Sequence, residues 1–225
     1  MSPIVIFDLD GTLVDTAPDL AASLNAAMAQ FSIQPLSTEA IRPLIGAGSR
    51  ALVARGFAAA GRMPSPEDNE RAITAFLDHY RANIAVMSEP FPGMIVVLEQ
   101  LRREGCRLGV CTNKFHDFSV ALLRALDLER FFAVVAGGDS YPVRKPDGGH
   151  ITRVAEALGG PLSEAVMVGD SGTDVAAARH AGVPVVAVSY GYTAVPPREL
   201  GADAVIDHAT ELPAALARLT PAWRS

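Results

Sequence analysis

The sequence predicts an α/β fold, in which helices cover both faces of a mainly parallel sheet and a helical domain is inserted into the chain. Three observations carry this prediction. Short apolar runs rich in β-branched residues recur along the chain, longer amphipathic stretches separate them, and residues 16–89 show helical periodicity without a convincing strand. Such alternation of strands and helices is typical of a doubly wound, Rossmann-like sheet with right-handed crossovers.

Six short runs are predicted strands, and several are apolar without alternation, which indicates parallel strands that are covered on both faces. They are residues 4–7, 107–112, 133–136, 165–168, 184–188 and 204–206. The predicted helices that accompany them are residues 93–104, 117–126, 150–158, 174–181 and 211–219. Gly105, Gly159 and Gly182 are placed to end three of these helices.

The segment after the first strand is predicted to be all helical. Residues 17–31, 49–60 and 66–87 have helical patterns, and Ser65 followed by Pro66 is a suitable start for the last of them. A connection of about seventy residues is far longer than an ordinary loop between a strand and a helix. We therefore predict two domains: a Rossmann-like core formed by residues 1–15 and 90–225, and an all-α domain formed by residues 16–89.

The charge pattern excludes several classes of partner. The chain of 225 residues has 19 basic and 25 acidic residues, a net charge of −6, and no run of Lys or Arg. Nucleic acid and anionic membrane surfaces are therefore poor partners. The chain also lacks a stretch of about 20 apolar residues and the basic start of a secretory signal, so we expect a cytoplasmic protein.

Pairs of carboxylates follow two predicted strands. Asp8 and Asp10 follow the first strand, and Asp170 and Asp174 follow the strand at residues 165–168. Each pair has a structural explanation, as a solvated turn or, with Ser171 or Thr173 as cap, as the start of a helix. If the strands are neighbours, however, the four carboxylates converge, and one pair at 4 Å repels by about 4 kcal/mol. An all-oxygen cluster of this kind favours Mg²⁺.

Polar residues of other types follow two further strands. Thr112 and Asn113 end the strand at residues 107–112, and Lys145 precedes Pro146 after the next strand. A lone Lys-Pro is commonly a basic turn. In an acidic protein, it also supplies the positive charge that an anion site requires.

In these residues the sequence resembles the haloacid dehalogenase-like superfamily of phosphatases over nearly the whole chain. The four motifs occur in the family's order: Asp8-x-Asp10-Gly11-Thr12, Thr112, Lys145, and Gly169-Asp170-Ser171-x-x-Asp174. The resemblance implies that the helical insert is a mobile cap. It also implies that Asp8 is the nucleophile and that Asp10 is the general acid and base.

The resemblance extends to the metal and the phosphate. It implies that Mg²⁺ binds through the Asp8 carboxylate, the Asp10 carbonyl and Asp170, with Asp174 in support. It further implies that Thr112 and Lys145 hold the transferring oxygens, with Asn113 nearby. The expected substrate is a small phosphorylated metabolite, and the protein is expected to be a monomer or a homodimer.

Other activities within the superfamily remain as alternatives. True dehalogenases work without metal and would have little use for Asp10, and the related ATPases have Thr at this position. A sugar-phosphate mutase would use the same core. A catalytically silent phosphate- or metal-binding module is a more distant alternative, since neither the nucleophile nor the lysine is lost.

Longer stretches resemble the phosphoglycolate phosphatases of this superfamily. They are residues 44–48, 111–114, 134–139 and 190–192, and related pyrophosphatases and nucleotidases share some of them. The resemblance implies 2-phosphoglycolate as the substrate. We expect Gly46 and Gly48 to expose backbone N–H groups at the start of a helix to a second anion, with Arg50 adding charge if it turns inward. The alternative is that both glycines only separate two helices and Arg50 points to water.

Overall fold

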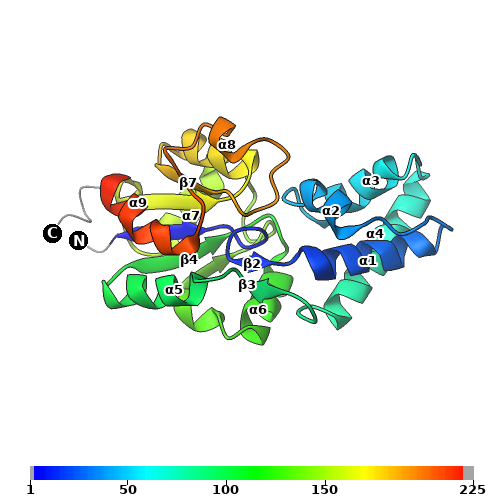
Figure 1. Ribbon diagram of the computed structural model, residues 1–225, viewed down its shortest axis with the longest axis horizontal. Helices are drawn as coiled ribbons and strands as arrows, with labels where there is room; N and C mark the ends of the chain where they lie inside the picture. The colour runs from blue at the N-terminus through cyan, green and yellow to red at the C-terminus, as the bar shows by residue number, and fades with distance from the viewer. Residues whose placement is uncertain (1–2, 220–225) are drawn as a thin grey trace.

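The computed structural model describes residues 3–219, which form two lobes joined by two short segments (Figure 1). The larger lobe contains the chain's first strand and most of its second half. The smaller lobe consists of helices from the segment after the first strand. Residues 1–2 and 220–225, which we assign to the predicted core, lie outside the described residues.

The larger lobe is built on a six-stranded sheet in which every neighbouring pair is parallel. The order is β5-β4-β1-β6-β7-β8. The strands are β1 (Ile4–Phe7), β4 (Arg107–Cys111), β5 (Val134–Ala136), β6 (Ala165–Gly169), β7 (Val185–Val188) and β8 (Ala204–Ile206). All six predicted strands are confirmed, with differences of one residue at most at either end.

Helices cover both faces of this sheet. They are α5 (Met94–Arg103), α6 (His116–Ala125), α7 (Gly148–Ala157), α8 (Gly172–Ala181) and α9 (Leu212–Leu219). In β1, Val5 and Phe7 pack in the apolar cluster with α5, α6 and α9, whereas Ile4 and Ile6 pack in the cluster with α7 and α8. This burial on both faces explains why β1 is apolar without alternation.

The smaller lobe contains α1 (Ala17–Ala29), α2 (Thr38–Ile41), α3 (Ser49–Ala59) and α4 (Pro66–Ala82). These helices share an apolar core that includes Leu24, Phe57 and Phe76. Ser65 caps α4 as predicted, since its hydroxyl accepts a hydrogen bond from the Asp68 N–H. That residues 16–89 form a separate domain remains a prediction.

The helix predicted over residues 66–87 is five residues too long. It ends at Ala82 because the backbone N–H groups of Met87 and Ser88 donate instead to the buried carboxylate of Asp19. The chain then enters β3 (Glu89–Pro90), which pairs antiparallel with β2 (Val14–Asp15) where the two lobes join. Sequence analysis missed this two-residue pair and α2, because both are too short to show a period.

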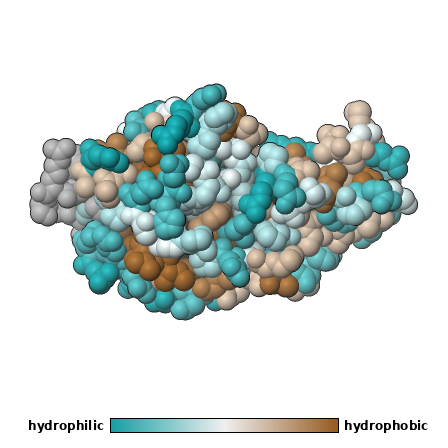
Figure 2. Space-filling view, viewed as in Figure 1, coloured by the Kyte–Doolittle hydropathy of each residue, from teal (hydrophilic) through white to brown (hydrophobic). Residues whose placement is uncertain are grey.

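Both ends of the described chain lie on the side of the larger lobe that is remote from the smaller one (Figure 1). On the face shown in Figure 2, side chains of the two lobes meet without a wide opening between them. No helix within residues 3–219 has the length and apolar character that crossing a bilayer requires.

Candidate active site

The order of the strands places the predicted site residues at one edge of the sheet. β1 lies between β4 and β6, and all three strands run in the same direction. Asp8 follows β1, Thr112 follows β4 and Asp170 follows β6, so the three residues meet at the carboxyl ends of the strands. Open α/β sheets bind their ligands at such an edge, where the order of strands reverses.

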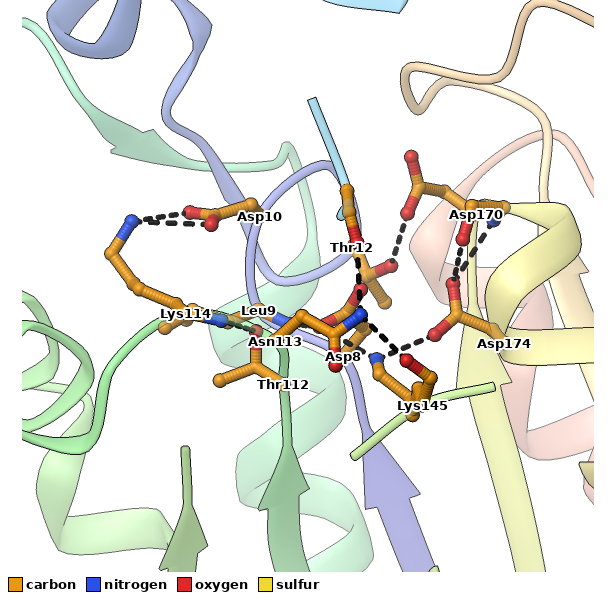
Figure 3. A network of polar contacts seen from close by, with 12 residues as sticks. Asp8, Leu9, Asp10, Thr12, Thr112, Asn113, Lys114, Lys145, Asp170 and Asp174 are labelled. Carbon is orange, nitrogen blue, oxygen red and sulfur yellow. Dashed lines mark hydrogen bonds and ion pairs between the residues drawn. The ribbon is translucent and has the colours of Figure 1, made fainter. Parts of the chain in front are cut away.

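Three buried carboxylates and one lysine form the floor of the site (Figure 3). Oxygens of Asp8, Asp170 and Asp174, which we call the acidic cluster, all lie within 4.8 Å of one another. Lys145 Nζ lies 3.0 Å from Asp8 Oδ1 and 2.5 Å from Asp174 Oδ1. All four residues are at most 4 % exposed. One buried ammonium group therefore contacts two of the three buried carboxylates.

The acidic cluster is electrostatically strained. Burial raises the pKa of Asp8 to about 6, Lys145 opposes this increase, and the negative charge of Asp174 adds to it. Burial and the carboxylate of Asp174 likewise raise the pKa of Asp170 well above its ordinary value. Burial lowers the pKa of Lys145, but Asp174 and Asp8 outweigh this effect, so the pKa is raised and the side chain stays charged. The cluster thus has more negative charge than Lys145 can neutralise.

A divalent cation fits this arrangement. The donor set consists only of carboxylate oxygens, which are the ligands of hard cations such as Mg²⁺ rather than of zinc. Three carboxylates share the single ammonium group of Lys145, and the pKa values of Asp8 and Asp170 are raised, so the acidic cluster has negative charge that a cation would neutralise. The Asp10 carboxylate does not belong to this cluster, and the predicted contribution of Asp10 is its carbonyl.

Local structure fixes the orientation of Asp170. Its carboxylate accepts hydrogen bonds from the Thr12 hydroxyl at 3.3 Å and the Tyr192 N–H at 2.7 Å. Gly11, with φ of +81°, passes so close that a Cβ there would overlap the Asp170 carboxylate. Glycine is required at position 11 for both reasons: its backbone conformation and this close approach.

Asp174 caps the start of α8 and also belongs to the acidic cluster. Ser171 is the N-cap residue of α8, and the Asp174 carboxylate accepts hydrogen bonds from the Ser171 N–H and hydroxyl. The helix-start explanation of this motif is therefore correct, and the same carboxylate still contacts Lys145. A single residue both begins the helix and completes the acidic cluster.

Asp10 points away from the acidic cluster, toward Lys114 (Figure 3). The Lys114 ammonium lies 2.9 Å and 3.1 Å from the two Asp10 carboxylate oxygens, and the Thr16 hydroxyl donates to the same carboxylate at 2.8 Å. Lys114 is 8 % exposed, and its pKa is raised because Asp10 outweighs the effect of burial. The side chain of Asp10 thus lies beside the cluster and is held by two donors.

A small cavity lies between the two lobes above these residues. Its polar wall comes from the larger lobe and is formed by Asp8, Asp10, Thr112, Asn113 and Lys114. Its mainly apolar wall comes from the smaller lobe and includes Leu20, Ile45, Leu52, Phe76 and Tyr80. The space open to the centres of water-sized molecules is about 40 Å³, enough for a few waters. Only a small ligand fits there in this arrangement of the lobes.

Gly46 and Gly48 line this cavity as the sequence suggests, but Arg50 does not reach it. Both glycines have positive φ, 107° and 89°, and Gly48 is the N-cap residue of α3. The Asn113 amide, which also donates to the Lys145 carbonyl, donates to the Gly46 carbonyl and so links the lobes. Arg50 instead pairs with Glu70 on the surface, with 62 % of its side chain exposed. Arg50 therefore does not turn inward, and the alternative that it points to water is correct for this residue.

Sequence reasoning missed three residues of the site. Lys114 is part of a quoted stretch but received no role, although its position directly after Thr112 and Asn113 is a usable signal. Tyr192 likewise belongs to one of the resembling stretches, residues 190–192, but received no role. Tyr80 gave no signal, because it comes from α4 and only the folded chain brings it to the site.

Comparison with known proteins identifies the family. The sequence model of the haloacid dehalogenase-like hydrolases matches residues 5–188. The chain belongs to this family. It is 50 % identical over 211 residues to a phosphoglycolate phosphatase of Caulobacter vibrioides, covering 94 % of this chain and 89 % of the relative. It is 44 % identical over 215 residues to one of Mesorhizobium japonicum, covering 96 % and 95 %. This haloacid dehalogenase-like protein is therefore a phosphatase.

Solved structures of this family have the same fold. A predicted phosphoglycolate phosphatase of Haemophilus somnus superposes with a TM-score of 0.87 at 29 % identity, covering 94 % of this chain and 96 % of that one. CbbY of Rhodobacter sphaeroides, solved in complex with phosphate, has a TM-score of 0.79 at 26 % identity and the same coverages. The predicted α/β fold and the family resemblance are thus confirmed.

Proposed function

We propose that the protein is a Mg²⁺-dependent phosphatase that hydrolyses 2-phosphoglycolate to glycolate and phosphate through an aspartyl-phosphate intermediate. The observation that carries the proposal is the acidic cluster with Lys145, whose member Asp8 lines a small covered cavity. The names of the relatives support the choice of substrate. The complex of CbbY with phosphate supports phosphate binding in this fold.

Asp8 is the proposed nucleophile. Its Oδ1 accepts a hydrogen bond from the Leu9 N–H at 2.7 Å and lies 3.0 Å from Lys145 Nζ, so the carboxylate is held in one orientation. A carboxylate oxygen of Asp8 attacks phosphorus, and the bond from phosphorus to the glycolate oxygen breaks. Lys145 and the Thr112 hydroxyl hold phosphoryl oxygens, since positioning and charge neutralisation dominate phosphoryl transfer.

Asp10 is the proposed proton carrier. In its protonated form, Asp10 gives its proton to the departing glycolate oxygen and becomes a carboxylate. It regains a proton from the water that attacks the aspartyl phosphate, which releases inorganic phosphate and restores Asp8. Thr16 and Lys114 hold its carboxylate in place between these two steps. This division of roles separates the nucleophile inside the acidic cluster from the acid and base outside it.

Mg²⁺ has a defined place in this proposal. The residues that would hold it are Asp8, Asp170, Asp174 and the Asp10 carbonyl. When bound, it neutralises the negative charge that otherwise keeps an anionic carboxylate and an anionic phosphoryl group apart.

Residues 16–89 are the proposed cap domain. Its helices supply the apolar wall of the cavity, which excludes water from the reacting groups while the lobes are together. Exchange of substrate and product then requires the two lobes to separate about the joining segments. Large phosphate esters do not fit beneath the closed cap.

The proposal is tested by kcat/KM for 2-phosphoglycolate and for ethyl phosphate, which lacks the carboxylate. We expect a preference for 2-phosphoglycolate of at least about tenfold, equivalent to about 1.4 kcal/mol. EDTA should stop the reaction and Mg²⁺ should restore it. Equal rates on the two esters would remove the assigned substrate, and restoration by zinc but not by magnesium would contradict the assigned metal.

A further inference from the structure

The cavity contains one candidate for recognising a second anion by charge. Of the basic side chains in residues 3–219, only that of Lys114 lines the cavity. Lys145 lies deeper, against Asp8 and Asp174. An ammonium group has three N–H donors, and two short contacts to Asp10 leave donor capacity for a further acceptor. Lys114 can therefore bind a ligand's carboxylate without releasing Asp10.

The side chain of Tyr80 adds a second donor next to Lys114. Tyr80 is 2 % exposed, lines the cavity, and lies with its ring 4.5 Å from the Lys114 ammonium. Within residues 3–219, its hydroxyl makes no hydrogen bond of regular geometry, and the polar group with which it interacts is the Lys114 ammonium. Burial raises the pKa of this hydroxyl to about 12, so it remains a neutral O–H donor. A buried O–H without an acceptor is unfavourable, and a ligand acceptor would satisfy it.

The smaller lobe contributes further N–H groups on the same side. Gly48, the N-cap residue of α3, has no side chain to accept from the first N–H groups of the helix, and both Gly48 and Ser49 line the cavity. A helix N-terminus favours a negative group. Lys114, Tyr80 and this helix start thus line the same cavity as Asp8, the proposed nucleophile.

We propose that Lys114, with the Tyr80 hydroxyl, binds the substrate's carboxylate and so determines specificity for phosphate esters of small hydroxy acids. This inference rests on the proposed function and assigns its second anion site to particular side chains. Because Lys114 also contacts Asp10, the carboxylate end of a bound ester lies directly beside the proposed proton carrier. The same contact orients the departing oxygen toward Asp10.

The test measures a ratio of kcat/KM values, so that general damage to catalysis cancels. The three esters are 2-phosphoglycolate, ethyl phosphate and O-phosphoethanolamine, which have similar size but carry a negative, no, or a positive group. Lys114→Met keeps the apolar stem and removes the charge, and Tyr80→Phe removes only the hydroxyl. Arg50→Met is the matched control, since Arg50 pairs with Glu70 on the surface.

We expect Lys114→Met to reduce the ratio of 2-phosphoglycolate to ethyl phosphate at least about tenfold, and Tyr80→Phe to reduce it about threefold or more. Wild type should disfavour O-phosphoethanolamine relative to ethyl phosphate, and Lys114→Met should remove this difference. Arg50→Met should leave all ratios unchanged. Circular dichroism verifies the fold of each variant, and Tyr80→Phe, which keeps the aromatic ring, still tests the proposal if Lys114→Met does not fold.

The outcomes separate this inference from the proposed function. If wild type prefers 2-phosphoglycolate and both variants keep that preference, the carboxylate is bound elsewhere and the inference is overturned while the proposed function stands. If Lys114→Met lowers the rates on all three esters equally, Lys114 only positions Asp10, which also overturns it. If wild type does not distinguish the esters, the proposed substrate and the inference both fail.

Discussion

At the scale of single residues, Asp8 is buried beside two other carboxylates and the Lys145 ammonium, an arrangement that suits a nucleophile better than a residue of the apolar core. We expect Asp8→Asn to reduce phosphate release from 2-phosphoglycolate by at least about a thousandfold, because an amide is not a nucleophile toward phosphorus. The fold should persist, since an amide has nearly the same volume as the carboxylate. Phosphate release and circular dichroism measure the two effects. Wild-type turnover in this variant, after deamidation is excluded by mass spectrometry, would eliminate the mechanism.

The same substitution makes a prediction about stability and pH. Folding raises the pKa of Asp8 from 3.8 to about 6, so the folded state binds this proton more tightly than the unfolded state. The resulting stabilisation is complete below about pH 4 and is lost as the pH rises through about 6, an effect of about 3 kcal/mol. In EDTA, wild type should therefore lose more unfolding free energy than Asp8→Asn between these pH values. If urea denaturation gives the same loss of unfolding free energy with pH for both proteins, the raised pKa of Asp8 in the acidic cluster is contradicted.

Asp10 makes a prediction that depends on the leaving group. Ethyl phosphate releases a strongly basic alkoxide, which requires a proton, whereas acetyl phosphate of similar size releases acetate, which does not. In single-turnover measurements, Asp10→Asn should slow the first step on ethyl phosphate at least about tenfold more than on acetyl phosphate. Equal losses on both substrates would show that Asp10 acts in some way other than by protonating the leaving oxygen.

Three of the predicted site residues lie at positions that the strand pattern determines. Asp8, Thr112 and Asp170 directly follow apolar strands, and parallel strands bring such positions to one edge of the sheet. The direction of Arg50 stayed open in the sequence because its partner, Glu70, belongs to another helix, and no local pattern encodes the pairing. The role of Lys114 depends on Asp10, 104 positions away, and on Tyr80 from the other lobe. Such contacts require the folded chain.

At the scale of elements, the six sheet strands and the helices around them were predictable because each is buried with a regular pattern. The end of α4 was not, because it is decided by a tertiary contact. Asp19 on α1 accepts hydrogen bonds from the backbone N–H groups of Met87 and Ser88 and from the Ser88 hydroxyl. This buried carboxylate ties the beginning of the smaller lobe to its return segment.

Asp19→Asn tests this connection. In this variant, an NH₂ group replaces one acceptor oxygen and faces the N–H and O–H donors of Met87 and Ser88. Each hydrogen bond to the charged carboxylate is worth about 1.5–3 kcal/mol. We expect a loss of about 2–4 kcal/mol in the free energy of unfolding, measured in urea. Asp78→Asn is the matched control, because the Asp78 side chain is 68 % exposed and pairs with Arg81 one turn away in α4. Similar losses in both variants would contradict the role of Asp19.

At the scale of the whole molecule, the two lobes do not pack as independent bodies. The apolar core of the smaller lobe includes Phe118 from α6 of the larger lobe, and the Arg42 guanidinium from the smaller lobe contacts Asp15 at 2.9 Å and lies over the Tyr192 ring. The Tyr192 hydroxyl in turn donates to Asp15 and accepts from the Ala17 N–H. These contacts hold the lobes together over the acidic cluster, and they define how much room the cavity offers.

That room leads to a prediction about substrate size. Because the space open to the centres of water-sized molecules is only about 40 Å³, adding one methyl group to the α carbon of 2-phosphoglycolate should lower kcat/KM about tenfold, and AMP should be hydrolysed at least about a hundredfold more slowly. Leu52 on α3 lines the cavity and is 3 % exposed, so Leu52→Ala should enlarge it and reduce the discrimination against the methylated ester. Leu122→Ala, in the core of the larger lobe, is the matched control, since it should cost stability without changing this discrimination. If AMP and 2-phosphoglycolate react equally well in wild type, the smaller lobe does not limit access, and the apolar wall of the cavity is not what selects the substrate.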